Sequence, residues 1–125
     1  MGNPFESYPS IFVVDDEVGI AKMLAVILQM HLFNAIPYTD SQSALDAARA
    51  APPDYVISDI TMPGMTGVEL AILLRQEVPA CKVLLFSGQA GAADLIQEAR
   101  DAGHDFVLVQ KPIHPVKLVE TIRSL

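Results

Sequence analysis

Cysteine is nearly absent from this sequence, since Cys81 is the only one in 125 residues. A single thiol excludes an intramolecular disulfide framework and makes a reducing compartment the default environment. Long apolar runs are missing too, and no stretch approaches the length needed to span a bilayer. The first residues lack the regions of a signal peptide, and Glu6 stands where myristoylation requires Ser or Thr. These absences predict a cytoplasmic protein without a membrane attachment.

Basic residues are scarce as well. The chain has 8 Lys and Arg against 15 Asp and Glu, a net charge of −7, and no basic cluster. Binding to nucleic acid or to anionic lipid depends on such clusters, so direct binding to either is not expected. In contrast, 51% of the residues are apolar and only 18% are charged. This composition favours one domain with a buried core over a disordered chain.

Short apolar runs that are rich in β-branched or aromatic residues predict the strands. The four strong runs are residues 11–14, 55–57, 83–86 and 106–109. None alternates apolar with polar residues, so we expect both faces of each strand to be covered, as in a parallel sheet. A weaker strand is predicted at residues 35–38, where Pro37 cannot donate to a neighbour and therefore indicates a sheet edge.

Helical patterns fill the gaps between the strands. Helix spacing relates a first set of apolar side chains, Ile20, Met23, Leu24, Ile27 and Leu28. We expect Met23 and the nearby Met30 to be core residues. Ser41 is predicted to cap a second helix that ends before residues 52–53.

Three further helices are predicted in the second half of the chain. They cover residues 67–78, residues 92–102 with Gly103 as the stop, and a last segment that Pro115 opens. Strand and helix thus alternate five times without repeats. This order predicts a doubly wound α/β fold with parallel strands and helices on both faces. We expect residues 10–125 to form the domain and residues 1–9 to form an N-terminal tail.

Polar side chains stand where the strong strands end. Asp15 and Asp16 follow the first run, Asp59 the second, Ser87 the third and Lys111 the fourth. The carboxyl ends of parallel strands share one rim, where open α/β folds bind ligands. Any one of these residues has an ordinary explanation, such as a helix cap, a turn or a solvated lysine. Their coincidence at all these ends favours a common site.

The chemistry of this predicted site is that of phosphoryl transfer. Three converging carboxylates repel one another unless a cation lies between them. Oxygen ligands without His or Cys suit magnesium. Lys111 then serves as a counter-charge for a carboxylate or an incoming phosphoryl oxygen, and the Ser87 hydroxyl donates to another. A carboxylate nucleophile, a metal and a fixed ammonium are the parts that transfer to an aspartate needs.

These residues resemble the receiver domains of two-component response regulators, of the CheY-like family. The resemblance begins at about Ser10 and rests on residues 13–17 (VVDDE), 59–67 (DITMPGMTG), 86–88 (FSG) and 111–112 (KP). It implies a flavodoxin-like (βα)5 fold with the strand order 2-1-3-4-5. It also implies that the chain is a phosphoacceptor switch in a phosphorelay rather than a classical enzyme, one that promotes its own phosphorylation and dephosphorylation.

The resemblance also implies roles for individual residues. Asp59 is the expected phosphoacceptor. Asp16 and Asp59 are expected to bind magnesium through their carboxylates, Asp15 through water, and Thr61 through its backbone carbonyl. Receivers of this family take the phosphoryl group from a sensor histidine kinase or a histidine phosphotransfer protein.

On the other strands, the resemblance assigns Ser87 to the Ser/Thr switch position and Lys111 to the phosphoryl group. The Lys111–Pro112 bond is expected to be cis, at small cost before proline. The position three residues before the lysine usually carries an aromatic switch residue, but here it is Leu108. Phe106, two residues earlier on the same predicted strand face, or movement of the backbone is then expected to report phosphorylation.

The expected output is a change of the partner-binding face. The fourth helix has a thin apolar stripe, so it is the element most easily displaced. We expect a downstream protein or a second copy to bind the face made by the fourth helix, the fifth strand and the fifth helix. Because the chain stops soon after that last helix, we expect either a stand-alone receiver or a part of a longer protein, and Met1 at the start favours the first.

Three other functions fit these residues less well. A haloacid dehalogenase-type phosphohydrolase needs a second Asp two residues after its nucleophile, where this chain has Thr61. A flavin- or cobalamin-binding module is disfavoured because the first turn is acidic and no glycine-rich phosphate loop occurs. A receiver that only binds proteins, without accepting a phosphoryl group, is disfavoured by the complete set of site residues.

Overall fold

The computed structural model describes residues 7–88, 92–112 and 114–125. Within these residues, parallel strands form one five-stranded sheet in the order β2-β1-β3-β4-β5. The strands are β1 (Ser10–Val14), β2 (Asn34–Tyr38), β3 (Tyr55–Asp59), β4 (Lys82–Ser87) and β5 (Val107–Gln110). The predicted α/β fold, its strand order and the position of the Pro37 strand at an edge are confirmed.

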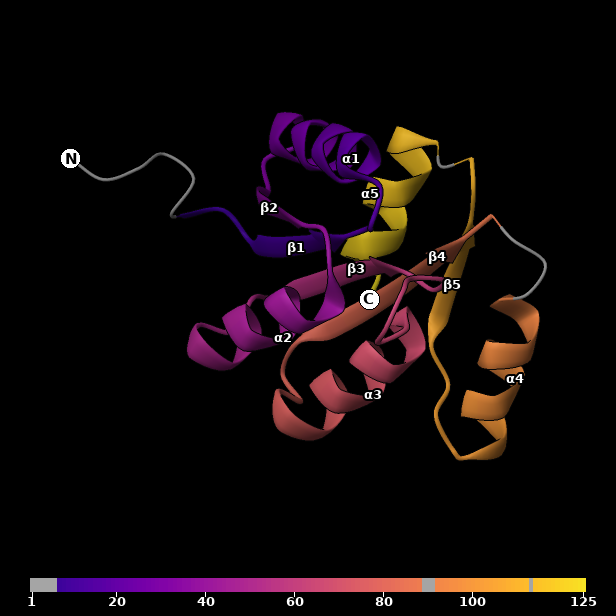
Figure 1. The fold of residues 1–125 in the computed structure, drawn as a ribbon. Helices are drawn as coiled ribbons and strands as arrows, with labels where there is room; N and C mark the ends of the chain where they lie inside the picture. Colours follow the sequence, from indigo (N-terminus) through magenta and orange to yellow (C-terminus); the bar gives the residue numbers. More distant parts are fainter. Residues whose placement is uncertain (1–6, 89–91, 113) are drawn as a thin grey trace.

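Two layers of helices cover this sheet (Figure 1). The helices are α1 (Val18–Met30), α2 (Ser41–Ala50), α3 (Gly67–Glu77), α4 (Ala92–Asp101) and α5 (Pro115–Arg123). Helices α1 and α5 share one core with the sheet, while α2, α3 and α4 pack against the other face. Among the described residues, no helix combines the length and apolar character needed to cross a bilayer.

The three central strands are buried on both faces. Successive residues alternate between the two cores, so that Ile57 faces α1 and α5 while Val56 faces α2 and α3. Cys81 lies just before β4 at 6% exposure, as a small apolar residue would. Burial, with a smaller contribution from nearby Asp54, raises the pKa of its thiol to about 11, which keeps this thiol protonated.

The fifth strand departs from the prediction that both faces of every strand are covered. It begins at Val107, and the side chains of Val107 and Leu108 are 45% and 38% exposed. As the last strand of the sheet, β5 has β4 as its only partner strand among the described residues. Phe106 lies outside the strand, with the guanidinium of Arg75 in α3 4.1 Å from the centre of its ring. The strand therefore begins one residue later than the predicted run 106–109, and Phe106 packs in the core with Leu85 and Ile96.

The first helix presents a different face from the predicted one. Met23 and Met30 are 54% and 75% exposed, so the interpretation of both as core residues is wrong. The fully buried positions are Ala21, Leu24, Ala25 and Leu28. Lys22 is the only charged residue in α1, so the pattern held two overlapping apolar stripes. The small alanines let the helix lie close to the sheet, and that stripe is the buried one.

The helix ends follow the sequence closely, apart from one cap. Asp40, not Ser41, caps α2, because its carboxylate accepts a hydrogen bond from the amide of Ser43. Ser41 is instead the first helical residue and is buried. Gly103 follows the end of α4 with a φ of +88°, as predicted for the residue that stops this helix. Pro115 opens α5, also as predicted.

Candidate functional site

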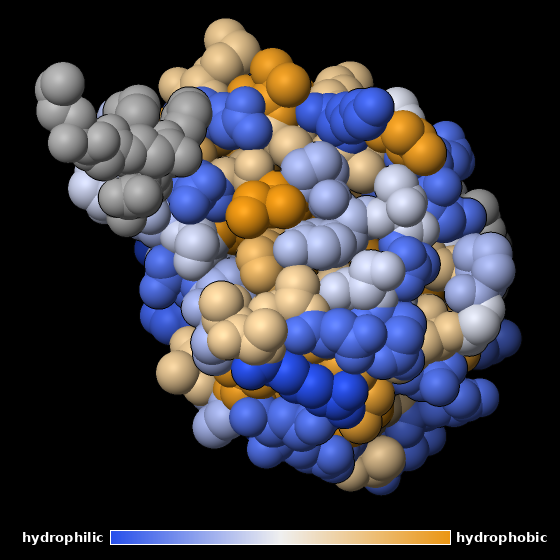
Figure 2. Space-filling model, turned by 60° about the vertical axis from the view of Figure 1, so that its left-hand side comes forward, coloured by the Kyte–Doolittle hydropathy of each residue, from blue (hydrophilic) through white to orange (hydrophobic). Residues whose placement is uncertain are grey.

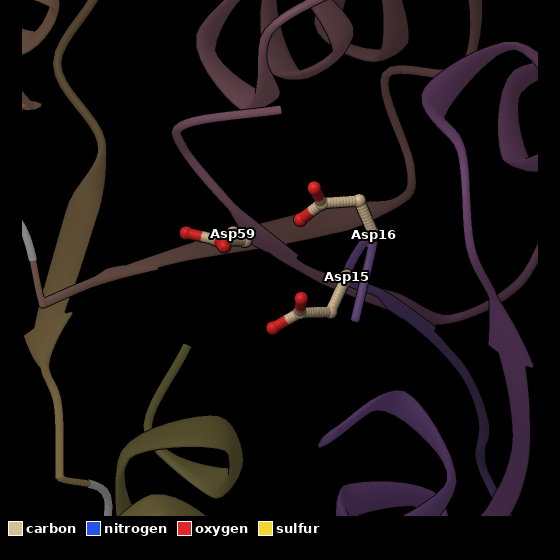
Figure 3. A group of neighbouring side chains, drawn as sticks. All are labelled: Asp15, Asp16 and Asp59. Carbon is tan, nitrogen blue, oxygen red and sulfur yellow. The ribbon is translucent and has the colours of Figure 1, made fainter. Parts of the chain in front are cut away.

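The predicted carboxylates meet at the carboxyl edge of the sheet. Asp15 and Asp16 follow β1, and Asp59 is the last residue of the adjacent strand β3. Figure 3 shows the three side chains reaching into the same space from these two strand ends. One carboxylate oxygen of each lies within 4.8 Å of the others. Parallel pairing of β1 with β3 is the cause, because it brings equivalent strand ends to one rim.

The carboxylates differ in burial and in their hydrogen bonds. Asp15 is fully buried, and its Oδ1 accepts a hydrogen bond of 2.9 Å from the amide of Glu17. Asp59 is 8% exposed, and its Oδ1 accepts one of 2.8 Å from the amide of Ile60. Asp16 is exposed. Two of the carboxylates are thus fixed by backbone donors, and the third borders solvent.

Lys111, which directly follows β5, joins the cluster from the strand next to β4. Its Nζ lies 3.3 Å from Asp15 Oδ2 and 3.4 Å from Asp59 Oδ2. Its aliphatic stem runs beside Gly88, where a Cβ would lie 3.1 Å from the Cβ of Lys111. The Lys111–Pro112 peptide bond is cis, as expected. The lysine therefore bridges the buried pair of carboxylates.

The electrostatics of the site favour an added cation. Burial raises the pKa of Asp59, and the negative charge of Asp15 raises it further, while Lys111 partly opposes both. Burial alone would lower the pKa of Lys111, but Asp59 and Asp15 together hold it above its usual value. One ammonium faces three carboxylates, so the site keeps an excess of negative charge. A purely oxygen donor set with this excess fits magnesium.

Ser87 and Thr61 lie on the segments that border this cluster. Ser87 ends β4 at 7% exposure, and its carbonyl accepts a hydrogen bond of 2.9 Å from the amide of Lys111. Thr61 is exposed in the loop that follows Asp59. The structure thus groups Asp15, Asp16 and Asp59 with Lys111, which contacts Asp15 and Asp59. Ser87 lies on the strand between Asp59 and Lys111.

Gly67 has a structural role beyond the helix start that the sequence predicts. A side chain at this position would overlap the backbone carbonyl of Asp59. Its amide donates a 2.8 Å hydrogen bond to the carbonyl of Ile60. The first turn of α3 therefore rests directly on the strand end that carries Asp59. The sequence signal was the glycine itself, eight residues after Asp59.

Known proteins resemble this chain over nearly its whole length. TcrX of Mycobacterium tuberculosis, a probable transcriptional regulatory protein, is 34% identical over 116 residues, which are 93% of this chain and 49% of TcrX. The DNA-binding response regulator MtrA of Mycolicibacterium smegmatis is 30% identical over 91% of this chain and 49% of its own. The chain therefore spans about half the length of these relatives.

Solved structures agree with this picture. The chemotaxis protein CheY4 of Vibrio cholerae superposes with a TM-score of 0.82 at 27% identity, covering 94% of this chain and 98% of CheY4. The signal receiver domain of an HD domain-containing protein from Pseudomonas fluorescens gives 0.84 at 26% identity, covering 94% and 93%. The protein-family model of the response regulator receiver domain matches residues 11–123. This chain belongs to the receiver domain family of two-component response regulators.

Proposed function

We propose that this domain receives a phosphoryl group on Asp59 from a sensor histidine kinase or a histidine phosphotransfer protein, with the help of magnesium. Receiver domains are signalling switches rather than classical enzymes. The observation that carries the proposal is the position of Asp59. Its carboxylate is largely buried, 3.4 Å from the Lys111 amine and grouped with two further carboxylates.

Magnesium would be held by the carboxylates of Asp16 and Asp59, by Asp15 through water, and by the backbone carbonyl of Thr61. When bound, the metal supplies positive charge for the developing charges of phosphoryl transfer. It also relieves the repulsion among the carboxylates, which burial makes stronger than in water. We propose these ligand roles on the basis of the oxygen donor set and its net negative charge.

In the proposed reaction, a carboxylate oxygen of Asp59 attacks the phosphorus of a phosphohistidine. The P–N bond to the histidine breaks as the P–O bond to Asp59 forms, which gives an acyl phosphate. Lys111 is placed to follow the charge from the carboxylate to a phosphoryl oxygen, because it already contacts Asp59 Oδ2. The Ser87 hydroxyl would donate to a second phosphoryl oxygen. The same residues would support the later hydrolysis.

The output face is proposed to be the surface of α4, β5 and α5, for a downstream protein or a second copy. Apolar side chains reach solvent there, notably Val107 and Leu108 on β5 and Val116 at 51% exposure on α5. We propose no nucleic-acid or membrane contact for these 125 residues, given their net charge of −7, and a cytoplasmic setting. DNA binding by a longer protein, as in relatives such as MtrA, would then require a separate segment.

Mass spectrometry after incubation with acetyl phosphate tests the proposal. With magnesium, the protein should gain the mass of one phosphoryl group, and chelation of the metal should abolish the gain. Asp59→Asn should remove the acceptor. Labelling of this variant at another aspartate would refute the assignment, and an unlabelled wild type would favour a receiver that only binds proteins.

A further inference from the structure

Two buried hydroxyls lie outside the site just described. The buried polar and charged side chains of the described residues are Asp15, Ser41, Ser58, Asp59 and Ser87. Three of these belong to the proposed phosphorylation site, and the other two are serines without a role in it. A buried hydroxyl costs free energy unless it is hydrogen-bonded. The hydrogen-bond partners of Ser41 and Ser58 therefore show what each buried hydroxyl holds in place.

Ser58 holds the beginning of the loop that follows β3. It is the penultimate residue of the strand and is fully buried. Its Oγ donates a hydrogen bond of 2.8 Å to the backbone carbonyl of Asp59. This carbonyl belongs to the residue whose side chain is the proposed phosphoacceptor. The hydroxyl thus restrains the peptide unit that joins Asp59 to the loop.

Ser41 holds the end of the same loop from a different element. It is the first residue of α2, 4% exposed, and its Oγ donates a hydrogen bond of 2.9 Å to the carbonyl of Met65. The two residues are 24 positions apart in the chain, so this bond fixes the loop to a separate helix. Met65 directly precedes Thr66, the N-cap of α3.

The loop between these two bonds carries a proposed metal ligand. Thr61, whose carbonyl is assigned to magnesium, lies between Asp59 and Met65. Met62 anchors the middle of the loop, since its side chain is 6% exposed in the core with Phe12 and Leu45. The segment is therefore fixed at its start, its middle and its end, although Thr61 itself faces solvent.

We propose that Ser41 and Ser58 are positioning residues that place Asp59 and the Thr61 carbonyl before magnesium binds. The inference rests on the proposed function, because it takes Thr61 as a ligand. Binding to a preformed site loses less conformational entropy than binding to a mobile loop, and hydrogen bonds behind the ligands are the usual means of fixing them. Neither serine is a catalytic residue, since each acts through a backbone carbonyl.

The test compares Ser41→Ala and Ser58→Ala with two matched serine variants. Ser43→Ala removes a hydroxyl from the same turn of α2, where it donates to Asp40 at 2.8 Å. Ser10→Ala removes one at the opposite end of the sheet, where it contacts Asp54 at 3.2 Å. Amide hydrogen exchange without magnesium and calorimetric magnesium titration are the two measurements.

We expect faster exchange at the amides of Ile60 and Gly67 in Ser41→Ala and Ser58→Ala, and about tenfold weaker magnesium binding. The two control variants should match the wild type in both measurements. If Ser58→Ala does not fold, Ser41→Ala decides alone, because the Asp40 cap of α2 remains. Unchanged magnesium affinity in a folded variant would overturn the proposal, even if its loop exchanges faster.

Failure of the proposed function has a different signature. If the wild type binds no magnesium, or binds it as tightly when Asp16 becomes Asn, the metal site itself is wrong. Faster exchange of the loop in the two serine variants would then still show that both hydroxyls hold the loop. The wild-type titration and the comparison among serine variants therefore separate the two ideas.

Discussion

Strands β3 and β5 both lead to a residue of the site, but the protein encloses them very differently. Strand β3 lies between β1 and β4 and is buried from Val56 to Asp59. Strand β5 leads directly to Lys111, yet no residue of this strand is fully buried. The proposed phosphoacceptor therefore stands on the most enclosed part of the sheet, and its lysine partner follows the least enclosed strand. The strand that carries the phosphoacceptor must keep its geometry, whereas the strand that transmits the signal must move.

Alanine substitutions should show the largest difference between the two strands. Ile57→Ala removes a fully buried side chain of β3 and should lower the free energy of unfolding by about 3 kcal/mol. Leu108→Ala, at a position of β5 that is 38% exposed, should lower it by less than about 1 kcal/mol. Urea unfolding followed by circular dichroism measures both. Equal losses would show that β5 is as firmly packed as β3, contrary to its exposure.

A smaller effect is expected at the end of β3, with a sign that depends on pH. Burial raises the pKa of Asp59, so ionisation of this carboxyl destabilises the fold. The stability that the protonated carboxyl of Asp59 contributes is fully present below its pKa in the unfolded chain. This stability is lost as the pH rises through its pKa in the folded protein. Asp59→Asn should therefore stabilise the protein at neutral pH, by up to about 1 kcal/mol because Lys111 opposes part of the effect of burial.

This gain should disappear as the pH falls toward 4. Asp40→Asn is the control of opposite sign, because hydrogen bonds from Ser43 lower the pKa of Asp40. That variant should be neutral or less stable at neutral pH, since the favourable ionised state is lost. Thermal unfolding over a pH series measures both variants. A destabilised Asp59→Asn at neutral pH would mean that the contact with Lys111 outweighs burial.

The smallest effect is a change of hydrogen exchange when beryllofluoride, a mimic of the phosphoryl group, is bound. Helix α4 buries only Ala92, Ile96 and Ala99, so its opening free energy should be low. We expect amides of α4 and β5 to change protection severalfold, while those of β3 change little. With Leu108 in the aromatic position, Phe106 or backbone movement has to carry the signal. Changes confined to α1 would refute this output face.

The sequence was sufficient for the fold and for the place of the site, because both depend on patterns that run along the chain. Unbroken apolar runs identified the central strands, and the polar residues after them identified the rim. The membership of Asp15, Asp59 and Lys111 in one cluster followed from parallel topology alone. The strand order came from the family resemblance, since the pattern constrained only the edge position of β2.

The remaining features depend on three-dimensional neighbours that the pattern does not contain. The apolar residues of β5 looked like those of a covered strand, and only the sheet order leaves them exposed. Helix α1 is apolar on nearly all sides, so packing had to choose between its alanine and methionine stripes. In Figure 2 hydrophobic residues reach the surface at the level of α1, consistent with exposed Met23 and Met30. Likewise, no local signal connects Ser41 with Met65.

Proline at the β2 edge also limits how this sheet could grow. The carbonyl of Tyr38 accepts a hydrogen bond from Asp15, so Tyr38 points its backbone groups toward β1 and Pro37 points its own outward. An additional strand arriving at this edge would meet a position without an N–H donor. Extension by a foreign strand, the route to domain swapping or fibril formation, is thus disfavoured past β2. Of the two edges, β5 is the one left for backbone pairing.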